Sequence, residues 1–100
     1  MSGLDTYTKD VVESNVDTVL KNVKEFQRLA SFLLLFVGIE PGLETILSYV
    51  FGYLEGLTKG FYVSKHGWQM SSNEIEELDN LLKKRAWEIR QAFITTKIEK

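Results

Sequence analysis

The sequence contains no cysteine, and only one proline and one histidine among its 100 residues. Without cysteine the chain has no disulfide and no thiolate metal site, so its fold must be stabilised by packing alone. The lone histidine, His66, has no second nitrogen ligand or sulfur ligand to share a zinc ion with. We therefore expect no metal and no cofactor, and we interpret His66 as an exposed loop residue.

The sequence also lacks a surplus of charge and a long apolar run. Its net charge is -2, with 44% apolar and 26% charged residues, which is typical of a soluble globular protein. A charge this near neutral argues against non-specific nucleic-acid binding. The longest apolar stretch, 29–39, is about half of the roughly 20 residues that a membrane-spanning helix needs. We expect a single cytoplasmic domain over 1–100, and peripheral contact with a membrane remains an alternative.

No catalytic motif stands out in the sequence. A glycine-rich phosphate loop, a nucleophile elbow, an HExxH pair and an EF-hand loop are all missing. The neighbouring carboxylates Glu76 and Glu77 point to different sides of a helix, so they do not form an acid–base pair. The sequence therefore predicts a protein without enzymatic activity and without catalytic residues.

What the sequence does contain is a long apolar seam in its first third. Apolar residues recur there at alternating steps of four and three, which is the heptad spacing of a coiled-coil helix. Such a seam keeps one face of a helix apolar, and we expect this helix to cover 6–37. The seam consists of Val12, Val16, Val19, Val23, Phe26, Ala30, Leu33 and Val37.

Two further helices follow from turn and cap signals. Gly38 and Pro41 end the first helix, and an apolar stripe predicts a second helix over 42–57. Ser71 and Glu74 have the spacing of a capping box, which starts a third helix over 73–97. The segment 58–72 has no helical periodicity and is expected to be an ordered loop. The predicted fold is all-α: an antiparallel bundle of three helices, completed by dimerisation.

Two apolar sets lie outside these predicted core stripes. The first is in the last turns of the first helix, which is apolar nearly all round, and the second is on the third helix beside an arginine. One chain of three helices cannot cover both sets, so they predict a self-association or partner interface. For the second set, fraying of the C-terminus or a loop folded over the tryptophan is the alternative. The predicted interface residues are Leu29, Phe32, Leu35, Phe36, Trp87, Arg90, Ile94 and Ile98.

A row of small residues at four-residue spacing lies opposite the apolar stripe of the second helix. Such a row is typical of a groove that lets another helix approach closely. The alternative is that two of the glycines simply end the helix as C-terminal caps. The residues of this row are Ser48, Gly52, Gly56 and Gly60.

Together these patterns predict a non-enzymatic helical assembly or adaptor protein that acts as a homo-oligomer, most simply a dimer, with a possible protein partner. One alternative is a membrane-associated helical hairpin over 29–57. The other is a small nucleic-acid-binding regulator that uses the third helix, where four cations surround Trp87. These cations are Lys83, Lys84, Arg85 and Arg90.

Overall fold

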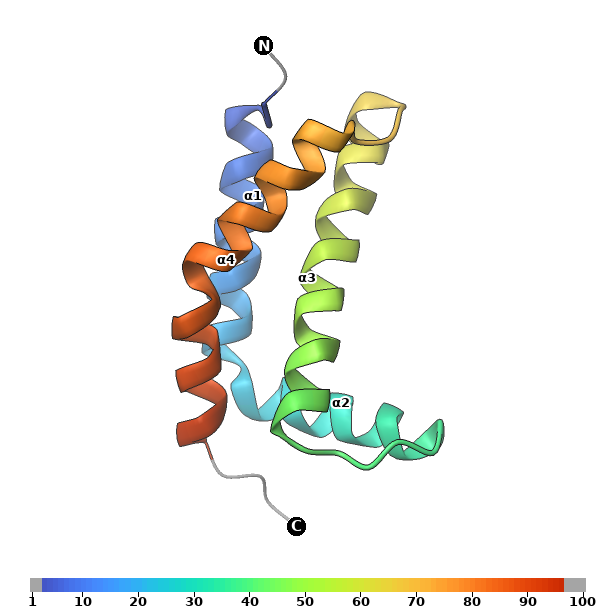
Figure 1. Ribbon diagram of the computed structural model, residues 1–100, viewed down its shortest axis with the longest axis vertical. Helices are drawn as coiled ribbons and strands as arrows, with labels where there is room; N and C mark the ends of the chain where they lie inside the picture. The colour runs from blue at the N-terminus through green and yellow to red at the C-terminus, as the bar shows by residue number, and fades with distance from the viewer. Residues whose placement is uncertain (1–2, 97–100) are drawn as a thin grey trace.

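The computed structural model describes residues 3–96, which fold into the helices α1 (Thr6–Lys21), α2 (Val23–Phe36), α3 (Leu43–His66) and α4 (Ser72–Thr95). In Figure 1, α1, α3 and α4 follow the long axis of a molecule measuring 47 × 26 × 17 Å, and α2 crosses beneath them. The predicted all-α fold is confirmed, with one helix more than expected. None of the helices in residues 3–96 is long and apolar enough to cross a membrane.

The expected single helix over 6–37 is wrong, because the chain bends at Asn22. This residue has φ -131° and ψ 39°, outside the helical range, and its N–H donates to the carbonyl oxygen of Val19 at 3.0 Å. Its side-chain amide donates to the carbonyl oxygen of Thr18 at 2.8 Å. Asparagine competes in this way for backbone groups that would otherwise continue the helix. As a result α2 turns away from α1 and lies across the end of α3 (Figure 1).

The bend also changes which side chains of α2 face the core. Leu34 is buried instead of Leu33, and Val37 is exposed, so the predicted seam is wrong beyond Ala30. Gln27 is buried as well, and its Nε2 donates to the carbonyl oxygens of Phe93 at 3.3 Å and Thr96 at 2.9 Å. These two bonds satisfy carbonyls at the end of α4. They fix α2 against the rest of the bundle.

A glycine turn ends α2. Gly38 has φ +83°, the left-handed conformation that favours glycine, and its N–H donates to the Leu35 carbonyl oxygen at 3.1 Å. The N–H of Ile39 donates to the Leu34 carbonyl oxygen at 2.8 Å. This pair of bonds is a Schellman motif, which satisfies the last carbonyls of the helix. The free end of α2 is therefore a defined turn.

The second helix is longer than expected, because α3 continues to His66. Thr58 and Tyr62 are buried and extend the inward stripe of Val50 and Leu54 at four-residue spacing. The expected loop over 58–72 is therefore wrong for its first nine residues. The helix ends only at Gly67, which has φ +79° and donates its N–H to the Val63 carbonyl oxygen at 2.8 Å.

The predicted start of α4 is confirmed. The Ser71 hydroxyl oxygen accepts from the Glu74 N–H at 3.2 Å, and the Ser71 N–H donates to Glu74 Oε1 at 2.8 Å. These two bonds form the capping box that the sequence indicates. The helices close around one core, in which α4 packs most extensively on α1. The fully buried apolar side chains of this core include Val12, Val16, Val19, Val50, Leu54, Leu78 and Ile89.

Candidate interaction surface

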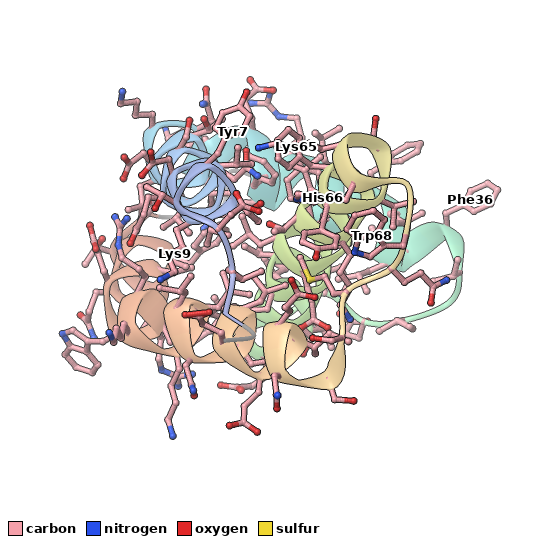
Figure 2. All side chains as sticks on the ribbon, turned by 90° about the horizontal axis from the view of Figure 1, so that it is seen from above. Tyr7, Lys9, Phe36, Lys65, His66 and Trp68 are labelled. Carbon is pink, nitrogen blue, oxygen red and sulfur yellow. The ribbon has the colours of Figure 1, made fainter. Side chains whose placement is uncertain are left out.

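The last two turns of α2 and the turn that follows form an exposed apolar arm, residues 29–39, which we call the α2 arm. Phe32 is 73% exposed, Leu35 62% and Phe36 80%. In Figure 2, Phe36 projects into solvent at the far end of α2, away from the rest of the molecule. No charged residue lies between Arg28 and Glu40. The large exposed apolar side chains of the arm are Leu29, Phe32, Leu33, Leu35, Phe36, Val37 and Ile39.

Four of these side chains share one face of α2. At 100° per residue they fall within about 120° of arc, opposite the buried residues Ala30 and Leu34. The structure thus places all four predicted interface residues of this helix on its solvent side. They are Leu29, Phe32, Leu35 and Phe36, and we call them the outward face of the α2 arm.

The α2 arm is large for a surface left in water. When each exposed fraction is applied to a full side chain of about 150–200 Å², its seven apolar residues present roughly 700 Å². The largest apolar patch on a typical monomer measures about 300–600 Å² and is often functional. A standard protein interface buries about 800 Å² on each partner. The arm alone therefore supplies most of one partner's share of an interface.

A smaller apolar patch lies on α4. Trp87 is 71% exposed and Ile94 is about half exposed, two turns apart on one side of the helix. Arg90, between them, is paired with Glu44 at 3.1 Å. The last predicted member of this set, Ile98, lies outside the described residues. In Figure 1 α4 and the free end of α2 stand on opposite sides of the molecule, so these are two separate surfaces.

The row of small residues lies inside α3 and faces solvent. The interpretation of Gly56 and Gly60 as C-terminal caps is wrong, because the helix continues to His66. A Cβ atom built on Gly52, Gly56 or Gly60 meets no atom within 4 Å in the described structure. The row therefore contacts no other helix of this chain, and whether a second chain packs there stays a prediction.

A cluster of polar and aromatic residues joins the start of α1 to the end of α3. His66 Nε2 lies 3.0 Å from Asp5 Oδ2, and the imidazole packs between the rings of Tyr62 and Trp68. Lys65 lies over the ring of Tyr7, 3.9 Å from its centroid. Figure 2 shows Tyr7, Lys65, His66 and Trp68 gathered at this end. The interpretation of His66 as an exposed loop residue is thus wrong.

The cluster depends on the Asp5 carboxylate. It accepts from the Thr8 N–H at 2.7 Å and from the Thr8 hydroxyl at 2.9 Å, which caps α1. The bond from the Thr8 N–H, the bonds from the Thr8 hydroxyl and His66, and the charge of Lys65 outweigh desolvation and lower the pKa of Asp5 to about 2. The Thr8 hydroxyl donates to Asp5 and not to His66, so it is not paired with the imidazole as a nucleophile is with its base. We therefore interpret the cluster as a structural contact between the start of α1 and the end of α3, which we call the clasp. Sequence reasoning missed it, because Asp5 and His66 are 61 positions apart.

Replacing Asp5 by asparagine tests this clasp. Asparagine keeps the cap but loses the charge, and 37% of the Asp5 side chain is exposed, so we expect a loss of only about 1 kcal/mol at neutral pH. Since folding lowers this pKa from 3.8 to about 2, the charge stabilises the wild type above pH 4. The difference between wild type and Asp5→Asn should shrink as the pH falls from about 4 to 2. Urea unfolding from pH 7 down to pH 2 measures it, and a difference independent of pH would contradict this account.

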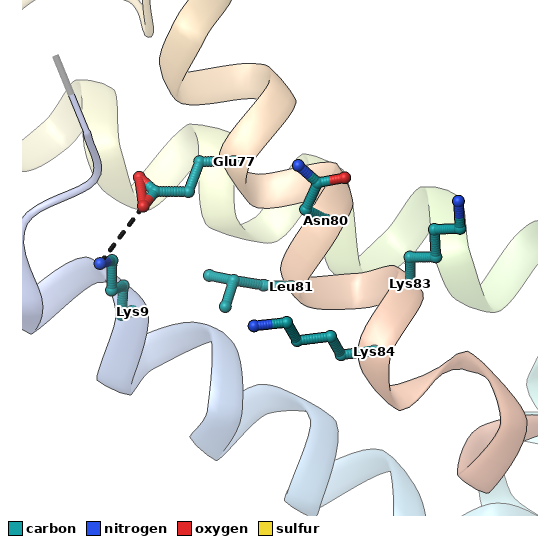
Figure 3. A pocket seen from close by; sticks show the side chains of 6 residues that line it. All are labelled: Lys9, Glu77, Asn80, Leu81, Lys83 and Lys84. Carbon is teal, nitrogen blue, oxygen red and sulfur yellow. Dashed lines mark ion pairs between the residues drawn. The ribbon is translucent and has the colours of Figure 1, made fainter.

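A polar cleft of about 580 Å³ lies between α1 and α4 (Figure 3). On one side Lys9 is paired with Glu77 at 3.2 Å, and Glu77 also accepts from the Leu4 N–H at 2.5 Å. These two bonds, that of Leu4 first, lower the pKa of Glu77. The cleft therefore has mixed charge. The residues that line it are Lys9, Glu77, Asn80, Leu81, Lys83 and Lys84.

Two of the four cations near Trp87, Arg85 and Arg90, are paired with carboxylates. Arg85 donates to Glu13 at 2.6 Å, to Asp17 at 3.0 Å and to Glu88 at 2.9 Å, which ties α4 to α1. These carboxylates neutralise Arg85 and place negative charge beside it. This arrangement does not favour nucleic-acid binding, which requires a continuous positive surface.

In residues 3–96 no group of three or more histidine and carboxylate side chains is placed to hold a metal ion.

Comparisons with known protein families, with curated proteins and with solved structures found no match. Among the described residues, the α2 arm is the largest exposed apolar surface and the feature from which a function can be inferred.

Proposed function

We propose that this protein is a non-enzymatic helical assembly or adaptor protein that self-associates through the α2 arm. The observation that supports this proposal is the exposure of the outward face on a helix that is otherwise anchored. Gln27, Ala30 and Leu34 are buried on the opposite side of α2, so the arm is presented in a fixed orientation. Exposed apolar patches of this size are typical of protein or membrane contact sites.

A second copy of the chain fits the α2 arm better than a lipid surface does. Helices that lie on membranes combine an apolar face with a polar face rich in lysine and arginine. Here the outward side of α2 carries one cation, Arg28, beside Glu25, and the arm is followed by Glu40 and Glu44. These carboxylates oppose contact with anionic lipid. We assign the smaller α4 patch of Trp87 and Ile94 to a protein partner, because an exposed tryptophan with a neighbouring arginine is typical of interface centres.

Measuring the mass in solution tests the proposal. Sedimentation velocity and light scattering of the wild type, from low micromolar to near-millimolar concentration, should show a reversible rise from monomer to dimer. Flotation with neutral and anionic vesicles serves as the comparison, and the protein should stay at the bottom of the gradient with both. A monomer at every concentration would overturn the proposal, and flotation of that monomer would indicate a membrane contact instead.

A further inference from the structure

The charges around the α2 arm are arranged in order along the chain. Arg28 precedes the apolar residues on the outward side of α2, and Glu40 follows them just after the glycine turn. Between these two residues lie eleven uncharged positions, 29–39. About eight helical residues and a turn separate the two charges, roughly 12 Å or more, so Arg28 and Glu40 of one chain are too far apart to pair with each other.

This order of charges is self-complementary in one orientation only. When two α2 helices lie antiparallel, the positive start of one stands beside the negative end of the other, and their helix dipoles also oppose. In a parallel pair, Arg28 would face Arg28 and Glu40 would face Glu40, and like charges in contact weaken an interface. The existing partner of Arg28, Glu25 at 3.5 Å, does not prevent a new contact, because both side chains are about two-thirds exposed and such pairs contribute little.

The apolar residues fit the same arrangement. Along the helical residues, which end at Phe36, a twofold axis level with Leu34 places each residue beside the residue of the other copy for which the two numbers add to 68. Phe32 then lies beside Phe36 of the second copy, and Leu33 lies beside Leu35, while Leu29 lies level with the second copy's glycine turn, which carries Ile39. Arg28 lies next to the same turn, which Glu40 follows. Every large apolar side chain of the outward face then meets the helix or the turn of the second copy, and the charged residues lie at the two ends, as in an interface with a dry centre and a polar rim.

We propose that two copies pair through antiparallel α2 arms about a twofold axis level with Leu34, with Arg28 of each copy facing Glu40 of the other. This inference rests on the proposed self-association and adds its geometry. A twofold contact of this kind is closed, because the same patch of both copies is used up in it. The assembly formed by this surface is therefore a dimer and not a chain of copies.

Cysteine cross-linking tests the orientation, and the chain, which has no cysteine of its own, gives no background. The variants are Leu29→Cys and Ile39→Cys, oxidised with copper phenanthroline separately and as a mixture. In the antiparallel pair the two Leu29 positions are about 15 Å apart along the helix axis, whereas Leu29 lies next to the turn of the other copy that carries Ile39. Only the mixture should cross-link. Cross-linking of each variant with itself would indicate a parallel pair, and a dimer that cross-links in neither way would show that the arms do not pair.

Charge reversal tests the register. Arg28→Glu or Glu40→Arg alone should raise the dimer Kd roughly 5- to 30-fold, because each reversal creates two like-charge contacts in the dimer. The double variant should return to within about threefold of the wild type. Lys84→Glu and Glu76→Lys, which change the net charge equally on exposed positions of α4, should leave the Kd unchanged.

The results that would contradict the self-association differ from those that would contradict the antiparallel register. A wild type that is monomeric at all concentrations removes the self-association itself. A wild-type dimer whose single charge variants lose affinity without rescue in the double variant leaves the self-association intact and overturns the antiparallel register. In the double variant, the glutamate introduced at position 28 still lies three residues after Glu25, so the like-charge repulsion within α2 remains. A recovery of the dimer affinity therefore cannot result from a more stable α2.

Discussion

Replacing Phe32 by aspartate should raise the dimer Kd at least about 100-fold and leave a folded monomer. Each Phe32 side chain contributes about 1.5–3 kcal/mol when it is buried in the interface, and two are lost per dimer. The variant also places a carboxylate in the apolar centre of the interface. The monomer should keep its fold, because 73% of Phe32 faces solvent in the isolated chain. Sedimentation velocity measures the Kd, and circular dichroism checks the helix content.

The matched control for this variant is Trp87→Asp. Trp87 is nearly as exposed as Phe32, at 71%, and the change adds the same charge, but the residue belongs to the α4 patch. We expect this variant to dimerise like the wild type. If Trp87→Asp lost the dimer and Phe32→Asp kept it, the self-association surface would lie on α4 and not on α2.

Replacing Gly52, Gly56 and Gly60 together by alanine should stabilise the protein by about 2 kcal/mol. Alanine has the higher helix propensity, by about 0.5–1 kcal/mol per site in a helix interior. Nothing within 4 Å obstructs a Cβ atom at any of the three positions. The melting temperature should rise by about 10 °C for a chain of this size. Thermal unfolding followed by circular dichroism gives the shift.

Gly67→Ala is the control for the glycine series. Gly67 has φ +79°, where a side chain is strained, so this variant should lose about 1–2 kcal/mol although its surroundings are open. If the triple alanine variant lost stability or dissociated the dimer, another helix would have to pack against the glycine row. That result would support the close-packing interpretation of this row and contradict an open face.

The sequence predicts the parts of the fold whose signals are local. The capping box of Ser71 and Glu74 and the inward stripe of α4 depend on residues within one or two turns of each other, and both are present. The exposure of Phe32, Leu35, Phe36 and Trp87 also follows from the sequence, because one small bundle cannot cover every apolar face. These predictions need only helical periodicity and the size of the chain.

The features that the sequence does not reveal depend on contacts between distant residues. The heptad seam runs through Asn22 without interruption, yet the chain bends there, and beyond the bend Gln27 donates to the carbonyl oxygens of Phe93 and Thr96, 66 and 69 positions away. Gly56 and Gly60 are interpreted from the sequence as helix ends, yet the burial of Thr58 and Tyr62 against the bundle outweighs the low helix propensity of these glycines.

The anchor formed by Gln27 has a consequence for the speed of assembly. Because α2 is already fastened to the bundle and its tip is closed by the turn at Gly38, an incoming molecule finds the arm in its docking shape. Little conformational entropy then has to be lost on encounter, and no rearrangement has to precede it. Association would proceed at the rate of ordinary rigid docking, roughly 10⁵–10⁷ M⁻¹s⁻¹, and differences in affinity among variants of the arm would arise from dissociation.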